Sequence, residues 1–220
     1  IDVCLFNGAI RNSENEEMAH LLSKKSKIMV AYGSCSTAGG IPALSNLTSK
    51  EATLDKIYIN NPSIDNAEAI MPQTEYEAPE GMLDLPEFYH TVKQLDQVID
   101  VDYYLPGCPP EPHQIWAVLE IVVAALHEGG ELPPKGAIVG AGTNAVCQEC
   151  PREKTEKAIT KFYRPYEVVP DPDLCLLEQG IVCMGPVTRN GCGALCPSVG
   201  MGCRGCYGAM DGVEDQRAKM

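Results

Sequence analysis

The sequence lacks the features of two common functional classes. It has few basic residues, since 17 Lys and Arg stand against 30 Asp and Glu, and its formal net charge is −13. A strongly acidic chain repels nucleic acid and anionic membrane surfaces. It also lacks a long apolar run, because the longest, from Ile121 to Leu126, is far shorter than the roughly 20 residues of a membrane span. We therefore expect no nucleic acid and no membrane among its partners.

The start of the chain lacks an initiator Met and a charged leader. It opens directly on residues 1–6, an apolar segment of the kind that forms a strand. We therefore expect the whole protein to extend upstream of Ile1.

Cysteine, in contrast, is abundant, with 11 residues in all. Eight of them crowd into a Gly- and Pro-rich stretch with few bulky hydrophobic residues. Eight thiols make two sets of four, the number that completes two cubane iron–sulfur clusters or two zinc sites. We expect this stretch to fold around inorganic centres that replace a hydrophobic core. The eight residues are Cys147, Cys150, Cys175, Cys183, Cys192, Cys196, Cys203 and Cys206.

The cysteine count also bears on the cellular compartment. A secreted disulfide framework is small and dominated by loops throughout, whereas residues 1–130 have ordinary α/β patterning. An odd total would also leave one thiol unpaired. Metal ligation in a reducing compartment fits better, and we expect a cytoplasmic protein.

Residues 2–32 have the pattern of a parallel βαβ unit. The segment 2–8 is mostly apolar, as in a strand that is buried on both faces. Acidic residues, an apolar stripe and then lysines follow over 13–25, as in a helix that begins at Asn12 or Ser13. The apolar segment 28–32 is a second strand, so a right-handed crossover joins the two.

The pattern changes beyond the first unit. Residues 44–92 have weak periodicity and many Asn, Pro and Glu residues, and we predict an irregular excursion shaped by a partner protein. A short strand is predicted at 102–105. An amphipathic helix is predicted from about 111 to 127, with Ile115, Val118, Leu119 and Val122 on its inward face.

Two predicted strands end in a Gly-containing turn that carries a cysteine, Gly33-Ser34-Cys35 and Pro106-Gly107-Cys108-Pro109-Pro110. Ligands bind at the carboxyl ends of parallel strands, so two thiolates there would make half of a cluster site. The alternative is a pair of structural cysteines, because free Cys is commonly buried. The contexts favour ligands, since Gly opens the backbone to close approach and Pro stiffens it.

Three further patterns have competing interpretations. Residues 140–145 match a dinucleotide-binding fingerprint, but no sustained helix is expected to follow them. The two C-x-x-C pairs, at 147–150 and 203–206, resemble a zinc ribbon that would leave four cysteines without a role. A zinc-stabilised binding module therefore stays open as an alternative function. The alternating charges of 152–161 predict a solvated helix face.

Together these motifs resemble the small subunit of a [NiFe] hydrogenase. The resemblance is carried by Gly-Ser-Cys-Ser-Thr-Ala-Gly-Gly at 33–40, by Pro-Gly-Cys-Pro-Pro at 106–110 and by the cysteine spacing from 147 to 206. It spans essentially the whole chain. The segment 175–194 is most similar to the cytoplasmic branch, and within it to the methyl-viologen-reducing (F420-non-reducing) enzymes of methanogens.

The resemblance implies a fold in two domains. Residues 1–135 would form a flavodoxin-like parallel-sheet domain whose first strand is missing here, and 136–220 a Cys-rich domain with two [4Fe-4S] clusters. A third, proximal cluster is held in the family by an early C-x-x-C and by cysteines that match Cys35 and Cys108. This chain has no early C-x-x-C, so two ligands are expected from the missing upstream segment.

The resemblance also implies the ligands of the other two clusters. Membrane-associated relatives hold the distal cluster with His-x-x-Cys and two later cysteines, and here Cys147 takes the place of the His. Their medial cluster has three irons and a Pro at the fourth ligand position, where this chain has Cys196. The implied distal set is Cys147, Cys150, Cys175 and Cys183, and the implied medial set is Cys192, Cys196, Cys203 and Cys206.

An electron-transfer function follows from the resemblance. Hydrogen would be activated in a partner large subunit, and this chain, with no catalytic residue of its own, would relay the electrons through three [4Fe-4S] clusters. The implied acceptor is an iron–sulfur subunit linked to heterodisulfide reductase, within a cytoplasmic hetero-oligomer. Small subunits of F420-, NAD(P)- or sulfur-reducing cytoplasmic hydrogenases are the alternatives.

Overall fold

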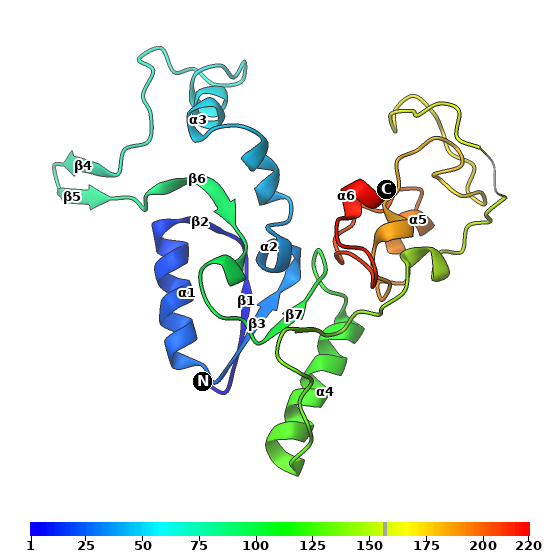
Figure 1. The fold of residues 1–220 in the computed structure, drawn as a ribbon. Helices are drawn as coiled ribbons and strands as arrows, with labels where there is room; N and C mark the ends of the chain where they lie inside the picture. The colour runs from blue at the N-terminus through cyan, green and yellow to red at the C-terminus, as the bar shows by residue number, and fades with distance from the viewer. Residues whose placement is uncertain (156–157) are drawn as a thin grey trace. The chain divides into compact units, whose positions relative to one another are not determined.

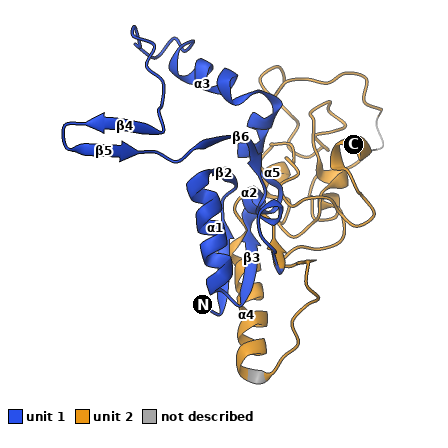
Figure 2. Cartoon of the chain, turned by 60° about the vertical axis from the view of Figure 1, so that its left-hand side comes forward, with its two compact units in different colours: residues 1–102 blue, residues 103–220 orange. Residues whose placement is uncertain are grey.

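The protein, represented by a computed structural model, is described at residues 1–155 and 158–220 (Figure 1). It divides into two compact units, residues 1–102 and residues 103–220 (Figure 2), and each is described by itself. The functional boundary that the sequence places between residues 135 and 136 stays a prediction.

The α/β class predicted from the sequence is confirmed by a pair of parallel strands in each unit. The strands are β1 (Val3–Asn7) and β3 (Ile28–Tyr32) in the first unit, and β7 (Tyr103–Leu105) and β8 (Ala137–Ile138) in the second. In the first unit β1 and β3 run parallel, and in the second unit β7 and β8 do the same. Parallel pairing requires a crossover between the paired strands, and helix α1 (Ser13–Lys25) provides it for β1 and β3.

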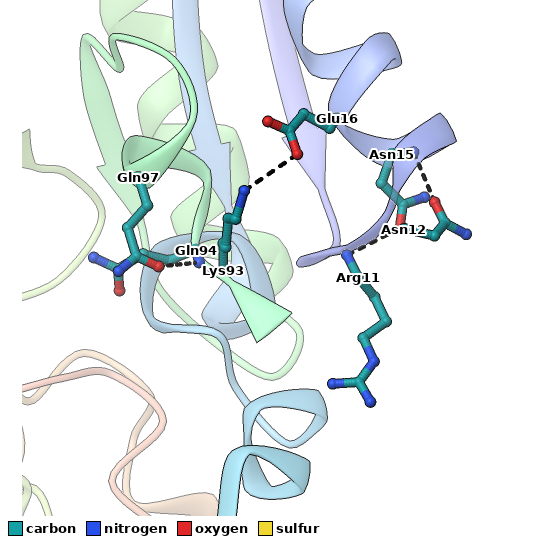
Figure 3. Close-up of polar contacts among 7 residues, drawn as sticks. All are labelled: Arg11, Asn12, Asn15, Glu16, Lys93, Gln94 and Gln97. Atoms are coloured by element: carbon teal, nitrogen blue, oxygen red, sulfur yellow. Dashed lines mark hydrogen bonds and ion pairs between the residues drawn. The ribbon is translucent and has the colours of Figure 1, made fainter. Parts of the chain in front are cut away.

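Helix α1 begins where the sequence predicted. The Asn12 side-chain oxygen accepts a hydrogen bond of 2.8 Å from the Asn15 N–H, which satisfies one of the free donors of the first turn (Figure 3). Glu16, also in this turn, lies 3.2 Å from the Lys93 ammonium (Figure 3). That contact ties the helix to strand β6 (Phe88–Lys93), which pairs with β2 (Ile10–Asn12).

The segment between β3 and β7 is more regular than the sequence indicated, so the prediction of an irregular excursion was wrong for much of it. Its helix α3 is capped by the Ser49 hydroxyl, which accepts from the Ala52 N–H at 3.1 Å. Its hairpin is exposed along nearly its whole length, so it lacks the apolar alternation that identifies strands in a sequence. The elements are α2 (Gly33–Ala38), η1 (Pro42–Leu47), α3 (Lys50–Tyr58), β4 (Glu75–Ala78), β5 (Gly81–Asp84), β6 and η2 (Leu95–Gln97).

The second unit begins with β7 and helix α4 (Pro112–Glu128), close to the predicted bounds. Pro at the first helical position and a Glu111–Gln114 capping box start the helix. Val118 is buried as predicted, but Leu119 is 37% exposed, so its inward placement was wrong. Gln114 takes the buried position instead, and its side chain donates to the Gly140 carbonyl.

Beyond β8 the described residues of the second unit have little regular structure. Their short elements are η3 (Val146–Gln148), η4 (Gly185–Val187), α5 (Leu195–Ser198) and α6 (Gln216–Lys219). The longest of these has four residues, so backbone ladders contribute little to the order of this region. Within the described part of the chain, no helix is both long and apolar enough to cross a membrane.

Leu105 anchors the end of β7, three residues before Cys108. It is fully buried, and its Cδ1 fills the space beside Gly140. We expect Leu105→Ala to lower the free energy of unfolding by about 2–5 kcal/mol, because it leaves a cavity. Leu126→Ala, at a position that is 52% exposed, is the control and should change it by about 0.5 kcal/mol or less. Urea-unfolding midpoints that fall equally in the two variants would contradict this account.

Candidate metal centres

Cys35 lies in the short helix α2 (Gly33–Ala38), directly after β3. Gly39 and Gly40 then take positive φ angles of 76° and 54°. A Cβ on Gly40 would lie 2.9 Å from the Cys35 Sγ, so any side chain here would collide with the sulfur. Gly40 thus keeps the space beside this half-buried thiol open, whereas a Cβ on Gly39 would lie 2.6 Å from the Ala43 Cβ.

Cys108 lies on a tight turn after β7 and is exposed. Gly107 has a φ of 143°, and a Cβ there would lie 2.4 Å from the Pro110 Cα. Only glycine fits this position, so the turn holds Cys108 in a defined place. Cys35 and Cys108 belong to different units, and their convergence on one cluster stays a prediction.

The four cysteines of the predicted distal set line one hollow. Its volume is about 300 Å³, counted out to open solvent. Gly185 forms part of its wall, and a Cβ there would lie 3.3 Å from the Cys147 Sγ and 3.5 Å from the Cys183 Sγ. The lining residues are Val146, Cys147, Cys150, Arg152, Lys154, Cys175, Leu176, Cys183, Gly185 and Pro197.

The pKa of Cys147 depends on the other three thiols of this hollow. Burial raises the pKa of Cys147 to about 11, together with the charges that Cys183, Cys175 and Cys150 would carry as thiolates, while Lys154 acts in the opposite direction. The three neighbouring thiols thus make Cys147 harder to ionise. A positively charged metal core that binds the sulfurs would reverse this effect, because it favours the thiolate form.

The predicted medial set is connected in a similar way. Burial raises the pKa of Cys206 to about 12, and the charges of Cys203, Cys108, Cys192 and Cys196 add to the rise. Four of these five residues form the medial set, and the fifth, Cys108, is the predicted proximal ligand. All five lie in the second unit.

Backbone N–H groups act on two sulfurs of the medial set. Burial raises the pKa of Cys192, and N–H groups of Ala194 and Leu195 oppose the rise by hydrogen bonding to its sulfur. Burial likewise raises the pKa of Cys203, against the Gly205 N–H and the Thr188 hydroxyl. Such donors stabilise negative charge on sulfur, and they are the contacts that tune iron–sulfur clusters.

The two sets meet in one buried cluster. Cys183 and Cys203 pack there with Val146 and Ala194. The Cys203 N–H also donates to the Cys183 Sγ at 3.3 Å. One residue from each set is therefore in direct contact.

Arg152 is placed differently from the sequence prediction. The described residues of 152–161 form no helix, and residues 156–157 lie outside the described part of the chain. Arg152 is buried, and its guanidinium donates to three backbone carbonyls, those of Pro197, Asp171 and Leu174. The prediction of a solvated helix face was therefore wrong for Arg152.

Glu149 is a site residue that the sequence reasoning missed. It lies inside the C-x-x-C of the distal set, and its carboxylate accepts from the Gly191 N–H at 2.7 Å and the Gly193 N–H at 3.0 Å. These two glycines flank Cys192 of the medial set. Glu149 therefore forms a brace between the two sets, because from within the distal C-x-x-C it holds the backbone around Cys192. Its position within the C-x-x-C was the only signal available in the sequence.

The dinucleotide lookalike at 140–145 has a structural explanation. No sustained helix follows it in the described residues up to 155, as expected, and a Cβ on Gly140 would lie 2.6 Å from the Leu105 Cδ1. A Cβ on Gly142 would collide with the Asn190 side chain, at 2.1 Å from its Oδ1. Both glycines thus serve close packing within the second unit.

The residues of the hollow fit a four-iron cluster. Such clusters are held by four thiolates with backbone donors to the sulfurs. Among the described residues, the lining of the hollow offers four thiols and no histidine or carboxylate. Across the residues that the structure describes, no three His, Cys, Asp or Glu side chains are grouped closely enough to hold a single metal ion.

Comparisons with known proteins identify relatives over the whole length of the chain. It is 42% identical to an iron-sulfur subunit of the F420-non-reducing hydrogenase of Archaeoglobus profundus, over 98% of this chain and 67% of that protein. It is 40% identical to a subunit of the F420-non-reducing hydrogenase of Methanothermobacter marburgensis, over 100% of this chain and 66% of that protein. The chain thus spans about two thirds of the length of these relatives. They confirm the resemblance to hydrogenase small subunits.

A solved structure and a family profile agree with these relatives. A chain of the crystal structure of an NAD+-reducing [NiFe]-hydrogenase in the H2-reduced state matches with a TM-score of 0.50 and 30% identity, over 60% of this chain and 68% of that chain. The profile of the family described as NADH ubiquinone oxidoreductase, 20 Kd subunit, matches residues 1–122. Because this match covers more than half of the sequence, the chain belongs to the NADH ubiquinone oxidoreductase 20 Kd subunit family.

Proposed function

We propose that this chain is the electron-transfer subunit of a cytoplasmic [NiFe] hydrogenase and that it holds three [4Fe-4S] clusters. Hydrogen is oxidised in a partner large subunit, and the electrons leave through this chain. The clusters, when bound, supply one-electron redox chemistry at low potential. The protein's part is to hold them at fixed positions, to exclude water and to direct N–H groups at the sulfurs.

The observation that carries the proposal is the arrangement of the Cys-rich stretch in two sets of four. The four cysteines of one set line a single hollow. In the other set, the charges of Cys192, Cys196 and Cys203 raise the pKa of Cys206. We assign Cys147, Cys150, Cys175 and Cys183 to the distal cluster and Cys192, Cys196, Cys203 and Cys206 to the medial cluster. Cys35 and Cys108 are assigned to the proximal cluster, with two further ligands from outside this chain segment.

Two contacts support an order for the relay. Cys108 acts electrostatically on Cys206, which brings a proximal ligand near the medial set. The Cys203 N–H donates to the Cys183 sulfur, which brings the medial set against the distal set. The medial set therefore has both a proximal and a distal ligand among its neighbours, in keeping with the series proximal, medial, distal.

The partners are proposed from the relatives and from the surface of the first unit. The names of the relatives indicate a hydrogenase that does not reduce F420, and we propose an iron–sulfur acceptor linked to heterodisulfide reductase. The segment from η1 to β5 exposes large apolar side chains, among them Leu47 at 80% and Met82 at 64%. We propose that the large subunit covers this segment, since an obligate interface buries such residues.

The composition of the anaerobically purified complex tests the proposal. We expect a hydrogenase large subunit to co-purify, together with iron and acid-labile sulfide in about equal amounts. Hydrogen should reduce the preparation and produce the EPR signals of reduced four-iron clusters. Stoichiometric zinc without sulfide would overturn the proposal and establish the zinc-stabilised module.

Replacement of Cys196 tests the assignment of the medial ligands. Cys196→Pro removes a thiolate at the first turn of α5, where Pro is tolerated. We expect the oxidised complex to show a three-iron EPR signal and about one iron atom fewer per complex. Cys4→Ala, which removes a half-buried thiol outside both sets, is the control and should match the parent. A parental spectrum in Cys196→Pro would show that Cys196 is not a ligand.

Replacement of Glu149 tests the brace between the two sets. Glu149→Ala leaves the Gly191 and Gly193 N–H groups without their acceptor, at a cost of about 1–3 kcal/mol for each group that stays buried. We expect a chelator to remove the medial cluster several-fold faster than in the parent complex, as followed by EPR. Glu149→Gln should be intermediate, because its amide oxygen still accepts. Glu153→Ala, at an exposed position nearby, should leave the rate unchanged, and equal acceleration in both alanine variants would contradict the brace.

A further inference from the structure

Arg152 is a buried cation whose hydrogen-bond partners are all neutral. Only 5% of the residue is exposed. Its Nε donates to the Pro197 carbonyl at 2.6 Å, and its Nη1 donates to the carbonyls of Asp171 and Leu174 at 2.7 and 2.9 Å. These bonds fix the guanidinium firmly but do not neutralise its charge.

The charge of Arg152 has no carboxylate partner in the part of the chain that the structure describes, where none lies within 4.0 Å of the guanidinium. Burial of a cation without an anion is strongly unfavourable. Arg152 does, however, line the same hollow as Cys147, Cys150, Cys175 and Cys183. Four thiolates on a cubane core give a net anion, since their charges exceed that of the core. The distal cluster would therefore be the missing counter-charge.

A purely structural role explains only part of this geometry. Arg152 joins three separate segments, at 171, 174 and 197, and would hold them in place whether or not it carried a charge. A neutral donor could bind the same carbonyls without the desolvation cost of a cation. The burial of a charge on a residue that lines the hollow together with four cysteines is therefore the feature that needs a second explanation.

We propose that Arg152 is a positioning residue that raises the midpoint potential of the distal cluster. The inference rests on the proposed function, since it requires a cluster on the distal set. One electron added to a cluster held by the distal set would give this site one further negative charge, with no change of bond or proton. A fixed positive charge nearby favours this more negative state, and arginine keeps its charge in both states. The last cluster of the relay thus becomes the easier one to reduce.

Lys154 provides a matched comparison, because it lines the same hollow but is exposed. Its Nζ donates to the Arg152 carbonyl at 3.1 Å and so lies close to the same cysteines. Water and salt screen an exposed charge much more than a buried one. Removal of the Lys154 charge should therefore have a smaller effect than removal of the Arg152 charge.

The test is a redox titration of the whole purified complex, followed by EPR of each cluster. In Arg152→Gln we expect the distal midpoint to become more negative, while the proximal and medial midpoints stay at their parental values. Arg152→Lys, which keeps the charge, should stay near the parental value. Lys154→Gln should shift the distal midpoint less than Arg152→Gln. An unchanged distal midpoint in Arg152→Gln, or equal shifts in Arg152→Gln and Arg152→Lys, would overturn the proposal.

Assembly of the variants gives a second criterion. Arg152→Met is a further neutral variant in case Arg152→Gln does not load the distal cluster. If both neutral variants fail to load it and Arg152→Lys loads it at the parental potential, the charge requirement is supported. If all three variants fail alike, Arg152 has a structural role only and the proposal is wrong.

The parent complex separates this inference from the proposed function. If its EPR spectrum shows no four-iron signal that depends on Cys147 or Cys183, the proposed function itself fails. If that signal is present and the Arg152 variants leave its midpoint unchanged, only the role of Arg152 is excluded.

Discussion

The fold of the second unit depends on the burial of its cysteine side chains. Beyond β8 the longest helix in its described residues has four residues, and its buried cluster contains two cysteines beside Val146 and Ala194. Burial raises the pKa of Cys147, Cys203 and Cys206, which favours their protonated form. Metal ions that bound these thiols would displace their protons, and the binding free energy would then become folding free energy. The order of this region is therefore tied to the chemistry that it carries.

Hydrogen bonds extend this dependence beyond the cysteines. The Glu149 carboxylate holds the glycines around Cys192, and the Cys203 N–H reaches the Cys183 sulfur. A movement of the backbone around one set would therefore also move the other set, because these hydrogen bonds join the two directly. Such rigidity suits a relay, because little has to reorganise when an electron arrives.

The sequence predicted those features whose signals are local. The cap at Asn12, the strand at 28–32 and the helix after Pro112 follow from periodicity and capping residues a few positions apart. The resemblance to hydrogenase small subunits, rather than the spacing alone, grouped the four thiols that line the hollow, and their roles as ligands stay predictions. Arg152 escaped detection because its acceptors are backbone carbonyls 19 to 45 residues away, and a carbonyl leaves no mark in a sequence. The exposed hairpin was missed because neither of its faces is buried.

That hairpin has a consequence for how the protein must be produced. β4 and β5 form a two-stranded sheet of their own, extending from the body of the first unit (Figure 1). Open strand edges that carry Met82 and Leu83 are templates for pairing with another chain, and a lone hairpin has little stability against such pairing. A cell that made this chain in excess over the large subunit proposed to cover it would accumulate a species prone to self-association. Such a surface requires that the two chains be made in a matched ratio, or that a chaperone shield residues 75–84 until assembly.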